Sequence, residues 1–581
     1  MDPGLEEAIL RTPPGEEIEA VALLRPGHSS PDALRVVTTF GPIVTGRILA
    51  GAVRAVRAHP AVVSLKAARV VELSAASPAA VPGTVRTGPS LGRRAPGIPA
   101  GRGVILGVLD WGCDFAHPAF LRPDGTTRLL ALWDQRQRGG PAGADNIYGY
   151  GRILDRARID RALTTPDPYS DLDYHPAVSD LTGVGAHGTL VMSIAAGSAS
   201  APAGAEGVAP EADLVFVHLA TGLLPDTANL GDSVRVLEGI EFVRRIAGTT
   251  PWVMNLSLGR TGGDKSGRSL VERAMDHVVQ AAPGRAIVQS AGNYFDKRTH
   301  AEGLIRAGRA ATLEWRIAPD DPTTNELEVW YSGRDVFRLE LVPPGAVRPF
   351  RVELGDRVAI QLDGQIVGRA YHRRHEPLTG DQHVDIFLEP GAPAGAWQVR
   401  LVGRDVVDGR FHAWIERDAA IPGAQSRFPP EMSSPRSTLG TIATGYRTFV
   451  VGAAGLTPGG PVIAPFSSSG PTRDGRVKPD LLAPGVSIVG ARSTPAGAPR
   501  GSGGLTALSG TSMAAPHVSG TVAALFSAAP RKLAAPETRA LVLGSAEWIP
   551  GLDPDRAGSG LLDTRAVFDS LARSLKRGNT T

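Results

Sequence analysis

The sequence predicts an α/β fold with a mostly parallel sheet, preceded by a small α+β unit and interrupted by a β-sandwich. From residue 102 to 296, apolar strand-like runs alternate with helix-like runs, which is typical of a parallel sheet covered on both faces. From 297 to 425, short alternating runs are separated by Pro, Gly and Asp, which is typical of a sandwich or jelly roll. Helix–strand alternation resumes after 440, so the sandwich is an insertion.

The chain of 581 residues is too long for one core, and changes in pattern divide it. A stretch rich in Ser, Pro and Gly separates the α+β unit from the α/β domain and is predicted to be a linker. The predicted parts are the N-terminal unit, the linker, the first α/β part, the inserted sandwich and the second α/β part, at 1–75, 76–100, 101–296, 297–425 and 426–581.

The elements follow from the periodicity of apolar residues. In the N-terminal unit, strand-like runs cover 18–27, 34–48 and 61–73, with a short helix at 50–60. The α/β part alternates strands with helices; its strands are predicted at 102–110, 212–220, 251–259 and 285–293, and its helices at 187–197, 232–248 and 268–282. Seven strands are predicted between 311 and 417. The segment 121–180 is expected to border the active site.

Composition excludes several classes of protein. Hydrophobic residues make up 42% and charged residues 20%, as in ordinary globular proteins, and the net charge is only +3. No dense basic block interleaved with aromatic residues is present, so no nucleic-acid partner is expected. One cysteine, Cys113, cannot form an internal disulfide or a cysteine-based zinc site. No apolar stretch is long enough to span a membrane. The acidic, Pro-rich start does not resemble a secretory signal, so a cytoplasmic location is expected.

Three polar residues follow strand ends or begin a helix in the α/β part. Asp110 ends the run "GVILGVLD"; it is either a turn former or an acid that orients a histidine. His187 begins the helix "HGTLVMSIAAG", and small neighbours leave its ring approachable. Asn293 follows "AIVQSAG" and is either a turn residue or an amide donor to an oxyanion. Each signal is weak alone.

The stretch "LTALSGTSMAAPHVSG" at 505–520 raises the question whether Ser512 is a helix cap or a nucleophile. A serine in the first turn of a helix has its own N–H free to face an oxyanion formed at its side chain. The order Asp110, His187, Asn293, Ser512 supplies acid, base, oxyanion donor and nucleophile in the chain order of the subtilisin triad. The α/β-hydrolase order fails, because the one histidine beyond Ser512 is His517, on the same helix.

Five segments resemble the diagnostic motifs of the subtilisin-like serine peptidases, the subtilases. They are "VLDWG", "HGTLVMSIAAG", "VMNLSLG", "AIVQSAGN" and "LSGTSMAAPHVSG". The run "DGTTRLLALWDQ" at 124–135 and the β insertion are similar to the clostridial spore-germination subtilases, which keep a prodomain and carry a jelly-roll insert. The resemblance implies a bacterial protein with a three-layer subtilisin-like fold.

The resemblance also implies roles for individual residues. Asp110, His187 and Ser512 would form the triad, with the Asn293 amide and the Ser512 N–H as the oxyanion hole. The edge segment Ser257, Leu258 and Gly259 would pair with extended polypeptide substrate and wall its first specificity pocket. The N-terminal unit would be a prodomain that acts as intramolecular inhibitor and chaperone and is cleaved by the enzyme itself.

The sequence thus predicts a self-processing serine endopeptidase. The alternative is a catalytically silent pseudoprotease that acts as a regulatory or binding scaffold, although no triad residue is missing here. No cofactor is expected for the chemistry. Calcium is frequent among subtilases, but no local acid cluster has the spacing of a calcium loop, so no metal is assigned.

Overall fold

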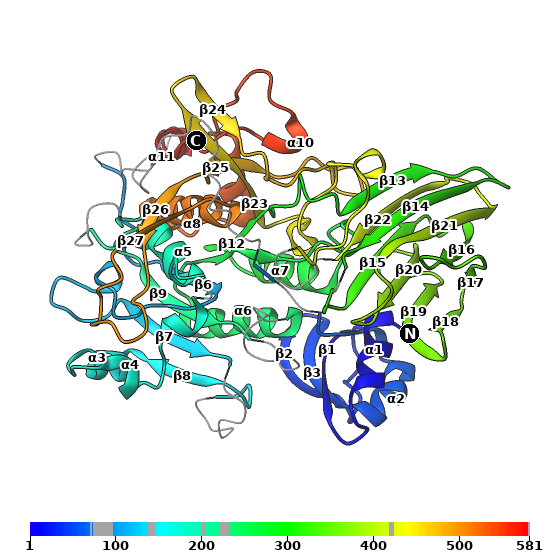
Figure 1. The fold of residues 1–581 in the computed structure, drawn as a ribbon. Coiled ribbons are helices and arrows are strands. Elements are labelled where there is room, and N and C mark those ends of the chain that lie inside the picture. The colour runs from blue at the N-terminus through cyan, green and yellow to red at the C-terminus, as the bar shows by residue number, and fades with distance from the viewer. Residues whose placement is uncertain are drawn as a thin grey trace.

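The computed structural model describes residues 1–69, 72–73, 97–136, 146–180, 182–199, 205–220, 232–319, 321–416 and 423–578. Most of the predicted linker lies outside these residues. The predicted α/β class, with an additional β insertion, is confirmed: a mixed central sheet lies between helices, and a β-sandwich extends from one side (Figure 1).

The central sheet has the strand order β24-β23-β12-β10-β6-β9-β7-β8, with β25 paired to β23. All neighbours are parallel except the two edge pairs, β23–β24 and β7–β8. Its strands are β6 (Ile105–Asp110), β7 (Leu129–Asp134), β8 (Arg152–Asp155), β9 (Asp213–His218), β10 (Trp252–Leu256), β12 (Arg285–Ser290), β23 (Phe449–Thr457), β24 (Gly460–Ile463) and β25 (Leu481–Pro484).

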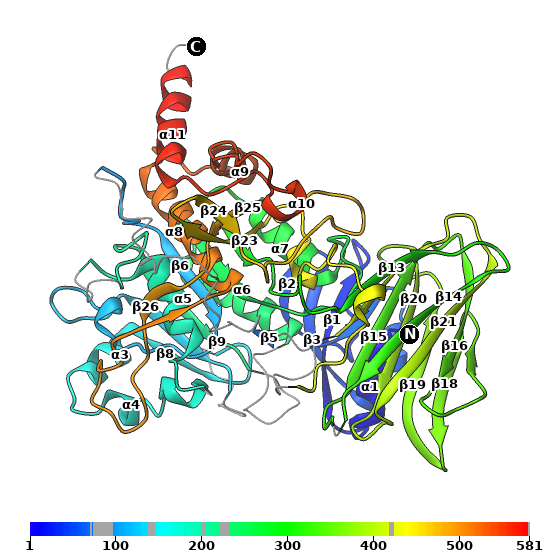
Figure 2. The ribbon, with the colours of Figure 1, turned by 45° about the horizontal axis from the view of Figure 1, so that its top comes forward.

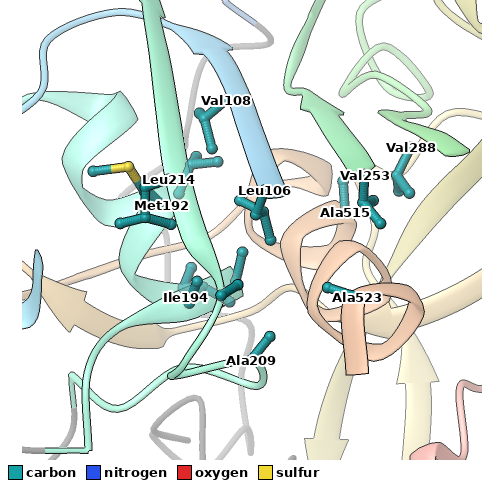
Figure 3. Packing of buried hydrophobic residues seen from close by; sticks show 14 of the residues in the cluster. Leu106, Val108, Met192, Ile194, Ala209, Leu214, Val253, Val288, Ala515 and Ala523 are labelled. Carbon is teal, nitrogen blue, oxygen red and sulfur yellow. The ribbon is translucent and has the colours of Figure 1, made fainter. Parts of the chain in front are cut away.

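Helices cover both faces of this sheet. One face packs against α5 (His187–Ala196) and α8 (Thr511–Ala528), and the other against α6 (Ser233–Ala247) and α7 (Leu270–Gln280). Figure 3 shows the first of these cores, where Met192 and Ile194 of α5 and Ala515 and Ala523 of α8 pack on residues of the strands. Because α5 and most of α8 are buried on every side, the majority of their side chains are small or apolar.

Shorter elements complete the α/β part and the C-terminal region. They are α3 (Arg156–Leu163), α4 (Pro168–Asp171), β11 (Leu258–Gly259), the hairpin β26 (Ile488–Ala491) and β27 (Leu505–Leu508), α9 (Ala535–Leu543), α10 (Pro554–Ala557) and α11 (Thr564–Gly578). Helix α11 projects from the body near the C-terminus (Figure 2). Part of the segment 121–180, which is expected to border the active site, also contributes β7 and β8 to the central sheet; the apolar run "LLALW" supplies a buried strand.

The N-terminal unit is a four-stranded antiparallel sheet in the order β2-β3-β1-β4. Its elements are α1 (Pro3–Arg11), β1 (Glu17–Leu24), β2 (Arg35–Phe40), β3 (Ile43–Leu49), α2 (Val53–Ala58), β4 (Val62–Ala67) and β5 (Glu72–Leu73). Alternate residues of β1 face opposite sides: Ala20 and Ala22 pack under the unit's own helices, and Val21 and Leu23 join the core around α6 and α7. Helix α1 was not predicted; Asp2 caps it and Pro3 begins it.

The insertion is a sandwich of a six-stranded sheet, β13-β22-β15-β20-β19-β18, and a four-stranded sheet, β14-β21-β16-β17. The strands are β13 (His300–Leu304), β14 (Ala310–Ile317), β15 (Asn325–Tyr331), β16 (Val336–Val342), β17 (Phe350–Val352), β18 (Arg357–Leu362), β19 (Gln365–Arg373), β20 (Gln382–Leu388), β21 (Gly395–Asp405) and β22 (Arg410–Ile415). Sequence patterns missed β13, β17 and β19, which are short or rich in polar residues and glycine.

The N-terminal unit lies between the α/β part and the six-stranded sheet (Figures 1 and 2). Towards the insertion, ion pairs join Lys66 to Glu376 at 2.9 Å and Glu7 to Arg369 at 3.3 Å. Towards α6, the buried Arg47 guanidinium binds the Glu238 carboxylate at 2.8 Å. No helix among the described residues has the length and apolar character needed to cross a membrane.

The Arg47–Glu238 pair gives a test of this packing. In Glu238→Ala, Arg47 and the Tyr150 hydroxyl, which donates to Glu238 at 2.6 Å, stay buried without that carboxylate. Removing one partner of a buried ion pair costs about 3–5 kcal/mol. Guanidinium unfolding followed by tryptophan fluorescence should show this loss, because Trp133 stacks on Tyr148 nearby. The control is Glu17→Ala, whose partner Arg35 is exposed; it should cost less than about 1 kcal/mol. Equal effects of the two substitutions would refute the proposed packing.

Candidate functional site

Asp110 and His187 meet at the carboxyl end of the central sheet. Asp110 is the last residue of β6 and is buried, and its Oδ1 lies 2.7 Å from His187 Nδ1. The backbone N–H of Trp111 also donates to Asp110 Oδ1, at 2.7 Å. His187 is the first residue of α5. The hydrogen bond holds a proton on Nδ1 and leaves the Nε2 lone pair as the available base.

Two glycines allow this approach of helix to strand. Gly112 has φ 72°, and a Cβ there would lie 2.5 Å from the Cβ of Ala186. At Gly188 a Cβ would lie 2.6 Å from the ring of Phe216. The Gly188 N–H donates to the Trp111 carbonyl at 2.8 Å, which fixes the start of α5 against the end of β6. Within the described part of the chain, His187 Nε2 has no hydrogen-bond partner.

Ser512 is the second residue of α8, whose N-cap position is Gly510. It therefore begins a helix without capping it, and its backbone N–H belongs to the first turn, where donors lack intrahelical acceptors. Its Oγ donates to the Ser257 carbonyl at 3.4 Å, and Ser257 Oγ donates to the Ser512 carbonyl at 3.1 Å. Ser512 is buried, and α8 packs against both α5 and β6.

Asn293 lies just beyond β12 and is held by the start of α8. Its Oδ1 accepts from the Thr511 N–H and from Thr511 Oγ1, both at 3.0 Å. Thr511 Oγ1 in turn accepts from the Gly292 N–H at 3.1 Å. With Oδ1 so engaged, the amide nitrogen Nδ2 lies on the Gly510 side, 3.3 Å from where a Cβ of Gly510 would be. The Asn293 amide donor is thus oriented next to Ser512.

The edge segment Ser257–Gly259 lies beside this cluster. Ser519 Oγ of α8 donates to Asn255 Oδ1 at 2.8 Å, and Asn255 Nδ2 donates to Ser257 Oγ at 2.9 Å. Strand β11 pairs antiparallel with β5, with Leu258 opposite Leu73 and Gly259 opposite Glu72. Strand β5, which follows the N-terminal sheet in the chain, therefore occupies the backbone edge of Leu258 and Gly259.

The structure adds residues that sequence reasoning missed. Thr511 orients Asn293, and Asn255 and Ser519 brace Ser257; hydroxyl and amide residues next to the motifs were the available signal. Two other residues near the motifs are buried. Burial raises the pKa of Cys113 well above its ordinary value, so its thiol is not ionised. His517 Nδ1 faces the Met513 carbonyl at 2.9 Å, and burial lowers its pKa to about 4.

Comparison with known proteins finds similarity to peptidases. A family model described as the subtilase family matches residues 101–314 and 417–569, on both sides of most of the insertion. Pyrolysin of Pyrococcus furiosus is 51% identical over 67 residues, which are 12% of this chain and 4% of that protein. The minor extracellular protease Vpr of Bacillus subtilis is 40% identical over 120 residues, 19% of this chain and 14% of Vpr.

The CspB protease of Clostridium perfringens has a similar structure, with a TM-score of 0.68 and 25% identity, covering 82% of this chain and 96% of that one. This agrees with the resemblance of the sequence to the clostridial subtilases. The matched regions span only a small part of the curated relatives' lengths, 4% and 14% for the two named above. The family model, in contrast, matches more than half of this chain. The chain therefore belongs to the subtilase family.

Proposed function

We propose that this protein is a serine endopeptidase, made as a self-processing zymogen, that cleaves peptide bonds through an acyl-enzyme on Ser512. The observation that carries the proposal is the 2.7 Å hydrogen bond between Asp110 and His187 at the carboxyl end of the central sheet, beside α8, which contains Ser512. Family membership supports this chemistry. The proposed reaction draws only on these side chains and backbone donors, and structural calcium stays unassigned.

In the proposed reaction, Ser512 Oγ attacks the scissile carbonyl carbon while His187 Nε2 takes its proton. Asp110 stabilises the imidazolium that forms and holds its orientation. The carbon–nitrogen bond then breaks, His187 returns the proton to the leaving amine, and Ser512 carries an acyl ester. Water, activated by His187, hydrolyses the ester and restores the serine. The 3.4 Å bond from Ser512 to Ser257 is weak, so the hydroxyl can turn towards His187 at little cost.

The negative charge on the substrate oxygen needs donors that are already oriented. Asn293 Nδ2 and the Ser512 N–H are the proposed pair. The hydrogen bonds from Thr511 to Asn293 Oδ1 support this role, because they fix the orientation of the amide group beside Ser512. The donors are therefore in place before the charge develops.

The proposed substrate is extended polypeptide, bound by backbone pairing to Leu258 and Gly259. The pairing of this edge with Glu72 and Leu73 supports inhibition by the chain's own N-terminal unit, because substrate and β5 would compete for the same backbone groups. The ion pairs of Arg47 with Glu238 and of Glu19 with Arg235, at 2.8 and 2.9 Å, hold that unit on α6.

Ser512→Ala should abolish peptide hydrolysis and leave an uncut chain of 60.6 kDa. The substitution removes the nucleophile and adds no bulk. Hydrolysis of a labelled casein and the mass of the purified chain are the measurements. The control is Ser509→Ala, three residues earlier and outside the proposed catalytic residues. This variant should still hydrolyse peptides and cleave its own chain. Full hydrolysis by Ser512→Ala would refute the proposal, and a wild-type chain that folds but never hydrolyses peptides would favour the pseudoprotease scaffold.

Asn293→Ala should lower kcat by about 10²–10³-fold with a small change in KM, the range known for removing such a donor from subtilisin. Thr511→Val should lower kcat by about five- to tenfold, because it removes one hydrogen bond that orients Asn293. Thr511→Ser retains the hydroxyl and should restore the rate. Steady-state kinetics on a peptide substrate test this, and a change confined to KM would contradict the oxyanion role.

Self-cleavage is expected within about three residues after Leu73. In an antiparallel pair, moving one residue forward along one strand means moving one residue back along the other. Each such step advances about 3.3 Å along the strand. Leu73 faces Leu258, and the residue before Leu258 is Ser257, whose carbonyl accepts from Ser512 Oγ. If the same pairing continued beyond Leu73, the peptide bonds that follow it would approach Ser512. Mass spectrometry of the mature protein should find both new termini there, and Ser512→Ala should have neither. Termini beyond Gly97, or before β5, would overturn this register.

A further inference from the structure

We propose that His300, Glu302 and His412 of the inserted sandwich form a binding site for a divalent transition metal such as zinc. The site lies outside the proposed catalytic machinery, on the adjacent antiparallel strands β13 and β22. In their register His300 faces Trp414 and Glu302 faces His412. Directly opposite residues, and residues two apart on one strand, share a face of the sheet. The three side chains therefore project together.

The distances between the ligand atoms suit one metal ion. His300 Nε2 lies 3.1 Å from His412 Nδ1, and His412 Nδ1 lies 3.7 Å from Glu302 Oε2. All three ligand atoms are within 4.8 Å of one another. Tetrahedral zinc with bonds of about 2.0–2.2 Å sets its ligand atoms roughly 3.3–3.5 Å apart. Small side-chain rotations would bring the three atoms to that spacing.

A competing explanation is a simple hydrogen bond between the two imidazoles, with Glu302 pointing to solvent. That explanation accounts for the 3.1 Å contact alone. It does not account for the orientation of the exposed Glu302 carboxylate: Ser434 Oγ donates to Glu302 Oε1 at 2.8 Å, and Oε2 lies on the side of His412. A partner that orients a ligating carboxylate in this way is typical of metal sites.

The histidine rings are also restrained before any ion binds. His300 and His412 lie nearly parallel to the Trp414 ring, with centroids 4.9 and 5.2 Å away. The Ser434 N–H donates to the His300 carbonyl at 2.8 Å, and Trp414 Nε1 donates to the Ser437 carbonyl at 3.0 Å. These contacts already restrict the two histidine side chains, so the side chains would lose little conformational entropy when a metal ion binds.

The ligand set selects the class of ion. Two imidazole nitrogens and one carboxylate oxygen suit zinc or cobalt, whereas calcium and magnesium prefer oxygen ligands alone. Three protein ligands leave room for water as a fourth.

The site lies where the sandwich meets the α/β part. The segment 434–439, which contacts β13 and Trp414 through Ser434 and Ser437, leads directly to Gly440, whose N–H donates to the Ala291 carbonyl at 2.9 Å. A bound ion would link β13 to β22 and so stabilise the insertion. Its effect is expected on thermal unfolding rather than on the chemical step.

Calorimetric titration of zinc into chelator-treated, full-length Ser512→Ala protein tests the proposal without self-cleavage. One equivalent should bind and raise the unfolding temperature, and cobalt should give the visible absorption of a tetrahedral nitrogen–oxygen site. His412→Ala and Glu302→Gln should each weaken zinc binding by about 100-fold or more. This is a larger loss than the removal of a residue that only hydrogen-bonds to a metal ligand usually causes. Because the readout is metal binding, the result does not depend on the proposed peptidase activity.

The matched control is His375→Ala, an exposed histidine elsewhere in the same sandwich, which should bind zinc as the parent does. Circular dichroism in chelator should show that the parent and all variants fold alike. If Glu302→Gln folds and binds zinc like the parent, or if the parent binds no equivalent of zinc, the site does not exist. Loss of binding in His375→Ala but not in His412→Ala would place the metal elsewhere and equally overturn the proposal.

Discussion

The contact between Asp110 and His187 requires the first residue of a helix to lie directly against the last residue of a buried strand. The 2.7 Å bond between the two side chains needs a close approach of α5 to the sheet. Gly112 and Gly188 allow it, because a Cβ at these positions would lie 2.5 Å from Ala186 and 2.6 Å from Phe216, respectively. Helix α8 then packs against α5 and β6 through small residues such as Ala515. The position of Ser512 is thus a consequence of close packing in the core, far more than of its local sequence.

The start of α8 is held against the sheet by hydrogen bonds, as the start of α5 is. Thr511 uses its backbone N–H and its hydroxyl to hold Asn293, and Ser512 and Ser257 exchange two hydrogen bonds. These contacts tie the start of α8 to the ends of β10 and β12. The side chains of the proposed site are therefore held in place by hydrogen bonds of the fold itself, which is the condition under which electrostatic stabilisation of a transition state is largest.

The three parts of the chain share a buried polar junction. Arg69 of the N-terminal unit binds Glu326 at 2.8 Å and Asp385 at 3.0 Å, both in the sandwich. Arg260 of the α/β part also binds Glu326, at 3.3 Å. These charged side chains come from different parts of the chain and pair with one another. The insertion therefore helps to position the N-terminal unit.

Local patterns predicted the elements that have either a continuous apolar run or a clear helical period. Strand β6 and helix α7 are such cases, and Asp110, His187, Asn293 and Ser512 were singled out by motif and chain order. Strand β7 was missed as part of the sheet because nothing local distinguishes a sheet strand from an apolar rim segment. The hydrogen bonds from Thr511 to Asn293 depend on tertiary packing, and the contact of His300 with His412 depends on strand register. Neither can be read from the periodicity of one sequence.

The central claim is that Ser512 is a nucleophile activated by His187 and Asp110. Labelling with a fluorophosphonate, followed by peptide mapping, tests it most directly, because the reagent reacts with activated serines and leaves a mass on the residue. The account predicts one adduct on Ser512 in the mature protein, and its loss when His187 is replaced by alanine. An adduct on Ser509 or Ser519 instead, or undiminished labelling of Ser512 without His187, would contradict it.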